Sequence, residues 1–441
     1  MNVAEKKQYN ESQKQKSAVA IVYCDSYNED KVYKAMTAGI EALGGIESFV
    51  RKDEHILVKT NFLVAAKPDK AVITHPSVIR GMLKLLHEHG YEHVVWGDSP
   101  GHGSLESAIR NAGLADTAAE FGYEPADMGT EVLTEYPEGI EAKQFYFAKA
   151  VTEADAIIGL CKMKTHALEK ITGAVKNMYG LICGYRKAAG HVKFPNASIF
   201  ARMLADIHHA TPQRLHIMDG IVAMEGNGPA SGTPVNMNVL LFSSDPVALD
   251  TVYCCLVNVD PTLIPTNAQG ELLGIGTCSF DNIEILDVRL SGADANAKKD
   301  SAAGKAELRA AGTYSEGNAP ADELSGTEFG AENKRFTVQA LTPTDAFAKY
   351  GNGSFDVDRT GGKKTFLSRF SDFMTSIARR PYIDASLCIK CGICTEHCPV
   401  PGKAVDFKNG RQKPPVYDYH RCIRCYCCQE MCPQHAIKVR K

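Results

Sequence analysis

Two stretches near the carboxyl end decide the fold of the last part of the chain: CIKCGICTEHCP at residues 388–399 and CIRCYCCQEMCP at residues 422–433. Each has the spacing C-x2-C-x2-C-x3-C-P, which is typical of bacterial ferredoxins that hold two [4Fe–4S] clusters. Three thiolates two residues apart on a tight turn can face one cubane, whereas the fourth follows on the next helical turn and reaches the second cluster. The spacing therefore predicts two interlocked clusters. The predicted ligands are Cys388, Cys391, Cys394 and Cys432 for one cluster and Cys422, Cys425, Cys428 and Cys398 for the other.

A pair of four-cysteine zinc sites is the alternative interpretation of these stretches. Zinc sites usually show two C-x2–4-C pairs, rather than four cysteines in one short run that ends in proline, so iron–sulfur clusters are favoured. Nine of the fifteen cysteines lie between Cys388 and Cys432, and this local crowding is unlike a secreted disulfide scaffold. The additional cysteine of the group, Cys427, lies between two predicted ligands and is expected not to bind iron.

The charge of the tail differs from that of the rest of the chain. Residues 381–441 carry ten Lys and Arg against five Asp and Glu, whereas the whole chain has a net charge of −3. Two oxidised clusters with their thiolates bring about −4, which makes the loaded tail nearly neutral. Free-standing ferredoxins that shuttle between partners are often acidic. The tail therefore resembles an internal electron relay docked on an acidic body, although charge on a solvated surface explains the excess equally well.

The overall composition is that of a globular protein. At roughly 100–200 residues per domain, 441 residues predict two or three domains. Apolar residues make up 44% and charged residues 23%, which excludes wholesale disorder. No apolar run reaches the ~18 residues of a membrane span, and the polar start MNVAEKKQYNESQKQK is unlike a signal peptide. We therefore expect a cytoplasmic protein, and the small net charge argues against a nucleic-acid partner.

The segment 17–291 alternates strand-like and helical patterns, which predicts an α/β domain with a mostly parallel sheet flanked by helices. The predicted strands are residues 18–23, 55–59, 93–97, 156–160, 215–219 and 238–242. The predicted helices are residues 31–43, 76–89, 104–111, 198–209 and 246–257.

The other segments have distinct compositions. Residues 1–16 are predicted to be a flexible polar arm, and residues 292–334, rich in Ala, Gly, Ser and charge, an exposed insertion or linker. Residues 335–380 are interpreted as a connecting segment with an amphipathic helix at 364–379, whose docking on the globular body is favoured over binding to a membrane surface. Residues 381–441 complete the chain as a small ferredoxin-like α+β domain for the two clusters.

Polar residues crowd after the predicted strands, where open α/β sheets place their ligands. A lysine-rich rim beside helix starts favours an anionic ligand, either a carboxylate or a phosphate. The predicted catalytic residues are Lys164, His166, Lys176 and Asp98, and the predicted substrate-binding residues are Lys59, Asn61, Asn177, Asp219, Glu225 and Asp245. No G-x-G-x-x-G opening a helix after a strand and no G-x-x-x-x-G-K-[ST] occurs, so no NAD, FAD or ATP site of the standard kind is predicted.

Each of these residues also has a purely structural interpretation. Asp98 and Asp245 can cap helices, Asn61 can lie in a turn, and Lys176 can lie on a solvated helix face. An additional metal held by Cys161 and His166 in the body is less favoured, because a buried thiol is commoner. The cluster of polar strand ends as a whole, rather than any single residue, predicts a functional site.

The order of motifs in the chain resembles the DUF362 family. The matching motifs are VKTNF, THPSVIR, GDSPG, CKMKTH, GAVKNMYG, DGIVAMEGNGP and DPVALD, followed by the paired ferredoxin motifs, and they cover most of residues 17–280 and the tail. The resemblance implies that the family's marked positions include Lys164, His166, Lys176, Asn177, Asp219 and Asp245. It also implies an anaerobic bacterial or archaeal setting. It implies no reaction, because the function of the family is unassigned.

The first functional hypothesis is an iron–sulfur oxidoreductase. The tail would take electrons from a ferredoxin-like or other redox donor and pass them to a small anionic substrate or cofactor at the strand ends. Lys59, Lys164 and Lys176 would neutralise the negative charge, while His166 or Asp98 would supply protons. Two alternatives remain: a non-catalytic electron-transfer or assembly subunit that docks on a partner enzyme, and a non-redox isomerase or lyase with structural clusters. The sequence gives no oligomeric state.

Overall fold

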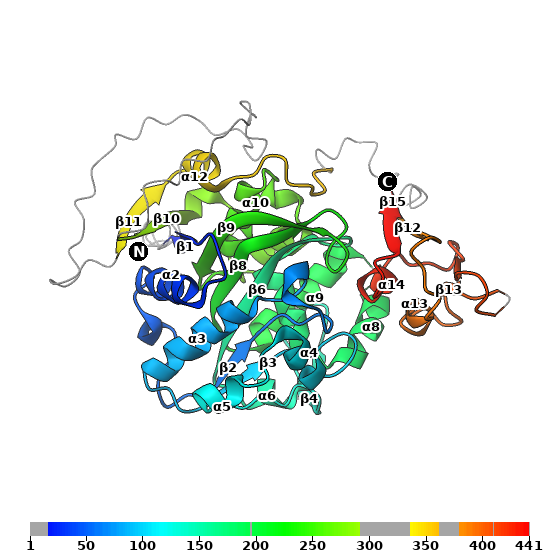
Figure 1. Cartoon of the computed structure of the whole chain (residues 1–441), viewed down its shortest axis with the longest axis horizontal. Helices are drawn as coiled ribbons and strands as arrows, with labels where there is room; N and C mark the ends of the chain where they lie inside the picture. Colours follow the sequence, from blue (N-terminus) through cyan, green and yellow to red (C-terminus); the bar gives the residue numbers. More distant parts are fainter. Residues whose placement is uncertain (1–15, 195, 292–335, 361–378, 409, 441) are drawn as a thin grey trace, which may run out of the picture.

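The structure is a computed structural model of the chain (Figure 1). It describes residues 16–194, 196–291, 336–360, 379–408 and 410–440. Three predicted features lie outside these residues: the arm 1–16 apart from Lys16, the insertion 292–334, and the amphipathic helix 364–379 apart from Arg379.

In the described part of the chain, nine strands form one mixed sheet at the centre of an α/β body. Along the sheet these are β11 (Phe336–Leu341), β10 (Ile283–Leu290), β1 (Ser17–Tyr23), β9 (Thr233–Ser243), β8 (Gln213–Glu225), β6 (Ala156–His166), β2 (Ile56–Lys59) and β3 (Val94–Gly97), and β7 (Lys170–Thr172) pairs with β6. Six of these strands share one direction, and β7, β9 and β11 run against them. The predicted α/β class with a mostly parallel sheet is thus confirmed.

Helices cover both faces of the sheet, because successive side chains of a strand point to opposite faces. Ala20 and Val22 of β1 pack in one core with α2 (Glu29–Glu41) and α3 (Pro76–Glu88). Val19 and Ile21 pack in a second core with α10 (Pro246–Leu256) and α12 (Pro343–Tyr350). The remaining elements of the body are α4 (Leu105–Ala112), α5 (Thr117–Phe121), α6 (Lys149–Thr152), α7 (Ala174–Asn177), α8 (Gly184–Lys193), α9 (Ala197–Ala210), α11 (Pro265–Leu272) and the hairpin of β4 (Glu131–Glu135) and β5 (Gln144–Ala148). Within the described ranges, no helix has both the length and the apolar sequence that crossing a membrane requires.

All six predicted strands occur, and three further features were not visible in the sequence. First, β9 runs antiparallel to both β1 and β8, so its carboxyl end lies at the opposite edge of the sheet from that of β8. Second, β10 pairs parallel with β1 although charged residues interrupt its apolar run. Third, β11 and α12 come from the segment 335–380 and extend the sheet and its second core. The side chains of β11 are mostly exposed, which explains why it lacks the apolar pattern of the inner strands.

The C-terminal domain (residues 380–440) contains two copies of one cysteine-bearing turn. Its elements are β12 (Arg380–Ile383), α13 (Ile393–Glu396), β13 (Val405–Asp406), β14 (Val416–Tyr417), α14 (Cys427–Glu430) and β15 (Ile437–Arg440). Gly392 and Tyr426, which directly precede α13 and α14, both have positive φ, at 89° and 61°. The same left-handed turn therefore follows the second cysteine of each motif. β12 pairs with β15 and β13 with β14, which is the small ferredoxin-like region that the motifs predict.

Candidate functional site

Each predicted set of four cysteines lines a small cavity of its own in the C-terminal domain. One cavity is lined by Cys388, Cys391, Cys394 and Cys432, and the other by Cys398, Cys422, Cys425 and Cys428. The fourth cysteine of each motif thus faces the cavity of the other motif, as the spacing predicts. Apolar side chains, among them Ile383, Ile437 and Val405, complete the walls. Such a dry shell controls solvent access to a metal centre.

The cysteine sulfurs surround these cavities rather than meeting at one point. Among the described residues, no group of three His, Cys, Asp or Glu side chains is arranged to hold a single metal ion. A [4Fe–4S] cluster binds four thiolates at its corners, so this arrangement fits a cluster better than a zinc ion. The backbone amides of Ala404 and Ala436 donate to Cys398 Sγ and Cys432 Sγ at 3.2 and 3.3 Å. Hydrogen bonds of this kind tune the reduction potential of a bound cluster.

The C-terminal domain docks on the body through α14, which Figure 1 shows on the side nearest the body. Gln429 Nε2 donates to the carbonyl of Gly228, in the turn between β8 and β9, at 3.0 Å. Glu430 Oε1 lies 2.9 Å from Nε2 of His166, at the end of β6. The side chains of Gln429, Glu430 and His166 are all buried in this contact. The cysteine-bearing helix is therefore held against the carboxyl ends of the parallel strands.

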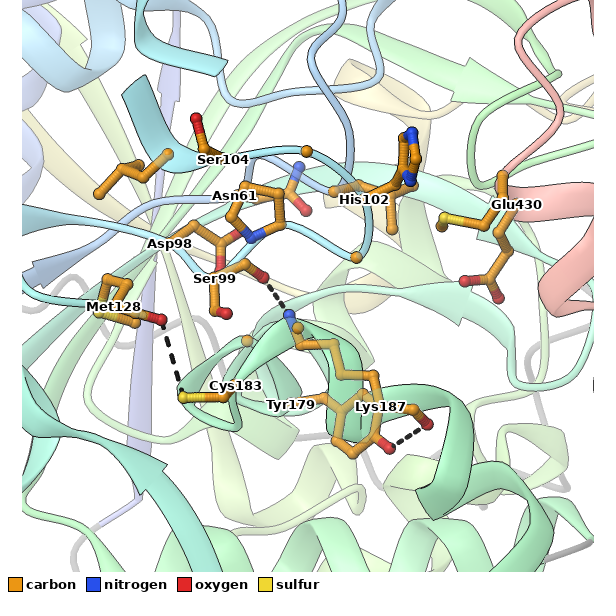
Figure 2. Close-up of a pocket in the computed structure, with 18 of the residues that line it drawn as sticks. Asn61, Asp98, Ser99, His102, Ser104, Met128, Tyr179, Cys183, Lys187 and Glu430 are labelled. Carbon is orange, nitrogen blue, oxygen red and sulfur yellow. Dashed lines mark hydrogen bonds between the residues drawn. The ribbon is translucent and has the colours of Figure 1, made fainter. Parts of the chain in front are cut away.

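A cavity of about 890 Å³, the junction pocket, lies where the body and the C-terminal domain meet (Figure 2). Its lining from the body includes Asn61, Asp98, Lys164, Lys176, Asn177 and Lys187. Its lining from the C-terminal domain is Glu396, His397, Cys427, Glu430 and Met431. Figure 2 shows Glu430 on the side of the pocket opposite to Met128 and Cys183. The volume is that of an ordinary small-molecule or cofactor site.

Lys164 contributes a buried amine to the wall of this pocket. Its Nζ donates to the carbonyl of Val72 at 2.7 Å, and the side chain is almost completely buried. Burial, together with the positive charges of Lys176 and Lys162, lowers the pKa of Lys164 to about 7. Near neutral pH this amine can therefore hold or release a proton while it stays in the pocket wall.

Lys176 is positioned by the short helix α7. Both carboxylate oxygens of the buried Asp250 accept backbone N–H groups at the start of α7, from Ala174 at 2.7 Å and Val175 at 3.1 Å. A Cβ at Gly173 would clash with the Asp250 carboxylate, so this close approach requires glycine. Among the described residues, no carboxylate lies within ion-pair distance of Lys176, whose Nζ lies 5.9 Å from the centroid of the Phe200 ring.

Asp98 is held by a buried lysine behind the pocket wall. Lys59 Nζ lies 2.8 Å from Asp98 Oδ1 and donates to Asn177 Oδ1 at 3.2 Å, while the Phe62 amide donates to Asp98 Oδ2 at 2.6 Å. Burial lowers the pKa of Lys59. A Cβ at Gly180 would clash with both members of the ion pair. Lys59 is absent from the pocket lining, so its charge is directed to Asp98 rather than to a ligand.

His166 lies behind Glu430 rather than in the pocket lining. Its Nδ1 accepts the backbone N–H groups of Leu168 and Glu169, both at 3.1 Å, so Nε2 carries the ring proton and faces Glu430. Burial lowers the pKa of His166 to about 4. Burial would raise the pKa of Glu430, but the contact with His166 and the charge of Lys176 outweigh it and lower that pKa to about 2. At neutral pH the pair is a neutral imidazole beside a carboxylate.

Sequence reasoning missed the part of the site that comes from α8 and from α14. Lys187 of α8 donates to the carbonyl of Ser99, and burial lowers its pKa to about 8. Tyr179 Oη donates to the carbonyl of Lys187 at 2.8 Å, and both residues line the pocket (Figure 2). The available signal was weak, because α8 follows no predicted strand. Glu430 lies among the cysteines of the tail, where only the docked structure shows its proximity to His166.

Two of the predicted substrate-binding residues lie near the same edge of the sheet but outside the pocket. Asp219 is completely buried and accepts hydrogen bonds from Tyr27 Oη at 2.9 Å and from Lys162 Nζ at 2.7 Å. Glu225 accepts the backbone N–H of Asp356 at 2.9 Å. Both oxygens of Asp219 and one oxygen of Glu225 are therefore used within the protein.

Asp245 lies at the opposite edge of the sheet, because β9 runs antiparallel to β8. Its Oδ1 accepts the backbone N–H groups of Val247 and Ala248, at 2.9 and 2.8 Å, and so caps α10. Its Oδ2 accepts the hydroxyl of Ser17, at the start of β1, at 2.7 Å. The geometry supports the helix-cap interpretation of this residue and separates it from Lys164 and Lys176.

Comparison with known proteins gives two family matches. The model described as "Domain of unknown function (DUF362)" matches residues 56–255, and the model described as "4Fe-4S dicluster domain" matches residues 380–433. A thylakoid-associated protein of Synechocystis sp. is 32% identical over 266 residues, which are 58% of this chain and 80% of that protein.

Two solved structures show a weaker likeness. The lactate racemase apoprotein from Thermoanaerobacterium thermosaccharolyticum is 15% identical with a TM-score of 0.34, over 54% of this chain and 57% of the racemase. A structural-genomics protein from Thermotoga maritima is 13% identical with a TM-score of 0.30, over 51% of this chain and 57% of that one. The chain thus spans less than two thirds of the length of either structure.

Proposed function

This chain belongs to the DUF362 family and carries a 4Fe-4S dicluster domain, and from that premise we propose that it is an iron–sulfur oxidoreductase whose substrate is a small anion bound in the junction pocket. Iron–sulfur domains of this kind transfer electrons. The finer part of the proposal is that the electrons leave the C-terminal domain for a ligand held by the body.

One observation carries the proposal: the two domains share the wall of one pocket. Cys427, the neighbour of the predicted ligand Cys428, lines this pocket together with the body's lysines, as does Glu430 on the same helix. A ligand bound there would contact the cysteine-bearing helix directly. Electron transfer to such a ligand would need no further carrier and no large movement of either domain.

The body's residues supply the charge and the proton that such a reaction needs. The clusters, when bound, supply electrons one at a time. Lys164, Lys176 and Lys187 bring three amines to the pocket lining, beside the carboxylates Asp98, Glu106, Asp127, Glu396 and Glu430. These amines are the groups that would pair with a carboxylate or phosphate. As the ligand gains negative charge, Lys164 Nζ can donate a proton to it, because its pKa near 7 permits both protonation states. His166 is neutral beside Glu430, so we assign the donation of the proton to Lys164 rather than to His166.

The experiment compares variants of the anaerobically purified full chain. We expect Lys164→Ala and Lys176→Ala to keep the iron and sulfide content of the wild type, but to lose turnover of small carboxylates and phosphates with a reduced viologen as donor. A second readout is the EPR spectrum of the reduced protein. An anion that binds beside α14 is expected to change that spectrum in the wild type and not in either variant. Lys52→Ala, at an exposed lysine of the body, is the control.

Two results would overturn the proposal. One is wild-type turnover by both variants. The other is that no carboxylate or phosphate is turned over or alters the spectrum of the reduced wild type, which would favour a non-catalytic electron-transfer subunit.

A further inference from the structure

A second large cavity, of about 790 Å³, lies on the C-terminal domain along β13 and β14, and we call it the basic groove. Figure 1 shows β13 on the side of this domain away from the body, whereas α14 faces the body. The cationic residues of the groove are Arg380, Lys403, Lys408, Arg421 and Arg424, against the two carboxylates Asp406 and Asp418. The groove is therefore positively charged, in keeping with the excess of Lys and Arg in residues 381–441.

The lining of the groove is also aromatic and partly apolar. Tyr417 and Tyr419 stack with ring centroids 5.6 Å apart and an interplanar angle of 14°. Val416 is 42% exposed and Tyr419 is 36% exposed, so apolar surface is presented between the cations. Apolar and aromatic side chains together with Arg are enriched in protein–protein contact surfaces.

The floor of the groove is one side chain away from a set of predicted cluster ligands. Tyr417 lines both the groove and the cavity of Cys398, Cys422, Cys425 and Cys428. Its hydroxyl lies 3.1 Å from Cys428 Sγ. Cys427, which directly precedes Cys428 in the chain, lines the junction pocket. The groove and the junction pocket thus lie on two sides of the same cysteine set.

We propose that the basic groove is the docking surface for a small acidic electron-carrier protein, which delivers electrons to the chain there. The proposal rests on the proposed function, since it names the partner that supplies the electrons. In each encounter one electron passes from the reduced carrier to the chain. No bond is made or broken, and the carrier leaves oxidised by one electron.

Charge and surface type together favour a protein over a small anion as the occupant. The cations of the groove attract an acidic surface and accelerate its encounter, and this effect weakens as salt is added. The exposed Val416 and Tyr419 give that surface an apolar contact, which a small hydrated anion would not use. The rest of the chain is net negative, so an acidic carrier is repelled there and attracted by the local positive charge of the groove.

The test measures how fast the clusters of the full chain are reduced. A photoreduced acidic flavodoxin is mixed with the oxidised protein in an anaerobic stopped-flow instrument, and the flavin absorbance, which differs from that of the clusters, is followed as the carrier loses its electron. We expect the double variant Lys408→Glu and Arg421→Glu to lower the second-order rate constant at least about tenfold at low ionic strength. Both side chains are exposed and neither lines a cysteine cavity, although Arg421 donates to the carbonyl of Pro401. In the wild type the same rate constant is expected to fall as salt is added.

Two controls separate docking from other effects. The double variant Lys34→Glu and Lys52→Glu makes the same change in charge at exposed positions of the body, and it is expected to react at the wild-type rate. A neutral zwitterionic viologen is expected to reduce all three proteins equally, because it needs no charged docking surface.

An unchanged rate in the groove variant, or a wild-type rate that salt does not alter, overturns the proposal. A loss of rate with the viologen as well would show a damaged cluster domain, and the salt dependence of the wild type then decides. The measurement requires no substrate. Failure of the groove and failure of the pocket chemistry are therefore distinguishable.

Discussion

Replacing Asp98 with Asn is expected to destabilise the body by about 3–5 kcal/mol, because it leaves the buried Lys59 ammonium without its counter-charge. Asp98 is 3% exposed, Lys59 is completely buried, and their charged atoms lie 2.8 Å apart. At this separation, an effective dielectric constant of about 20 gives an attraction of about 6 kcal/mol between the two charges. The decrease in the free energy of unfolding should not exceed this value. Burial already lowers the pKa of Lys59, and the loss of Asp98 lowers it further. The variant's stability is then expected to rise with pH, because the unfolded chain binds a proton that the folded chain has released.

The assay is the thermal midpoint of the anaerobically purified full chain. In a domain of about 150–250 residues, 1 kcal/mol shifts Tm by about 2–4 °C, so a fall of about 6–20 °C is expected at pH 7. Asp25→Asn is the matched control, because Asp25 pairs with Lys31 at 2.9 Å in an exposed position where solvent screens the charges. Equal shifts in the two variants would refute this account of the buried pair. So would a deficit in D98N that does not shrink as the pH is raised.

Three further predictions concern the cysteines, the pocket and the far edge of the sheet. Cys427→Ser is expected to keep the wild-type iron content, whereas Cys428→Ser is expected to lose about half of it. Iron and sulfide assays measure both contents, and equal losses in the two variants would make Cys427 a ligand. Anion binding in the junction pocket is expected to weaken as the pH rises through about 7, because the Lys164 ammonium loses its proton there. Lys164→Met should flatten that dependence in a calorimetric titration, and an unchanged slope would contradict the assignment. Asp245→Ala is expected to lower the free energy of unfolding by about 1–2 kcal/mol through loss of the α10 cap. Anion binding in the junction pocket should stay unchanged in this variant. Weaker binding would contradict the location of Asp245 at the far edge of the sheet.

Sequence reasoning succeeded where parallel strands bring their carboxyl ends to one edge. Asn61, Asp98 and Lys164 follow or end three neighbouring parallel strands, and they meet in the junction pocket. It failed at Asp245, because an apolar pattern does not show in which direction a strand runs. β9 runs antiparallel to β1 and β8, and this depends on its pairing with them. Lys59 is a different case, since the sequence places it at the correct edge but does not show that Asp98 takes its charge.

The cysteine spacing was enough to predict the two sets, because the paired ferredoxin motif ties this spacing to one interlocked arrangement. The sequence by itself also determined the α/β class, since apolar periodicity is local. Three features became visible only in the folded chain: α14 lines the junction pocket, Glu430 lies beside His166, and β9 runs against its neighbours. These features depend on contacts between residues far apart in the chain. Their stability is the sum of many small burial and hydrogen-bond contributions, and no short stretch of sequence contains that sum.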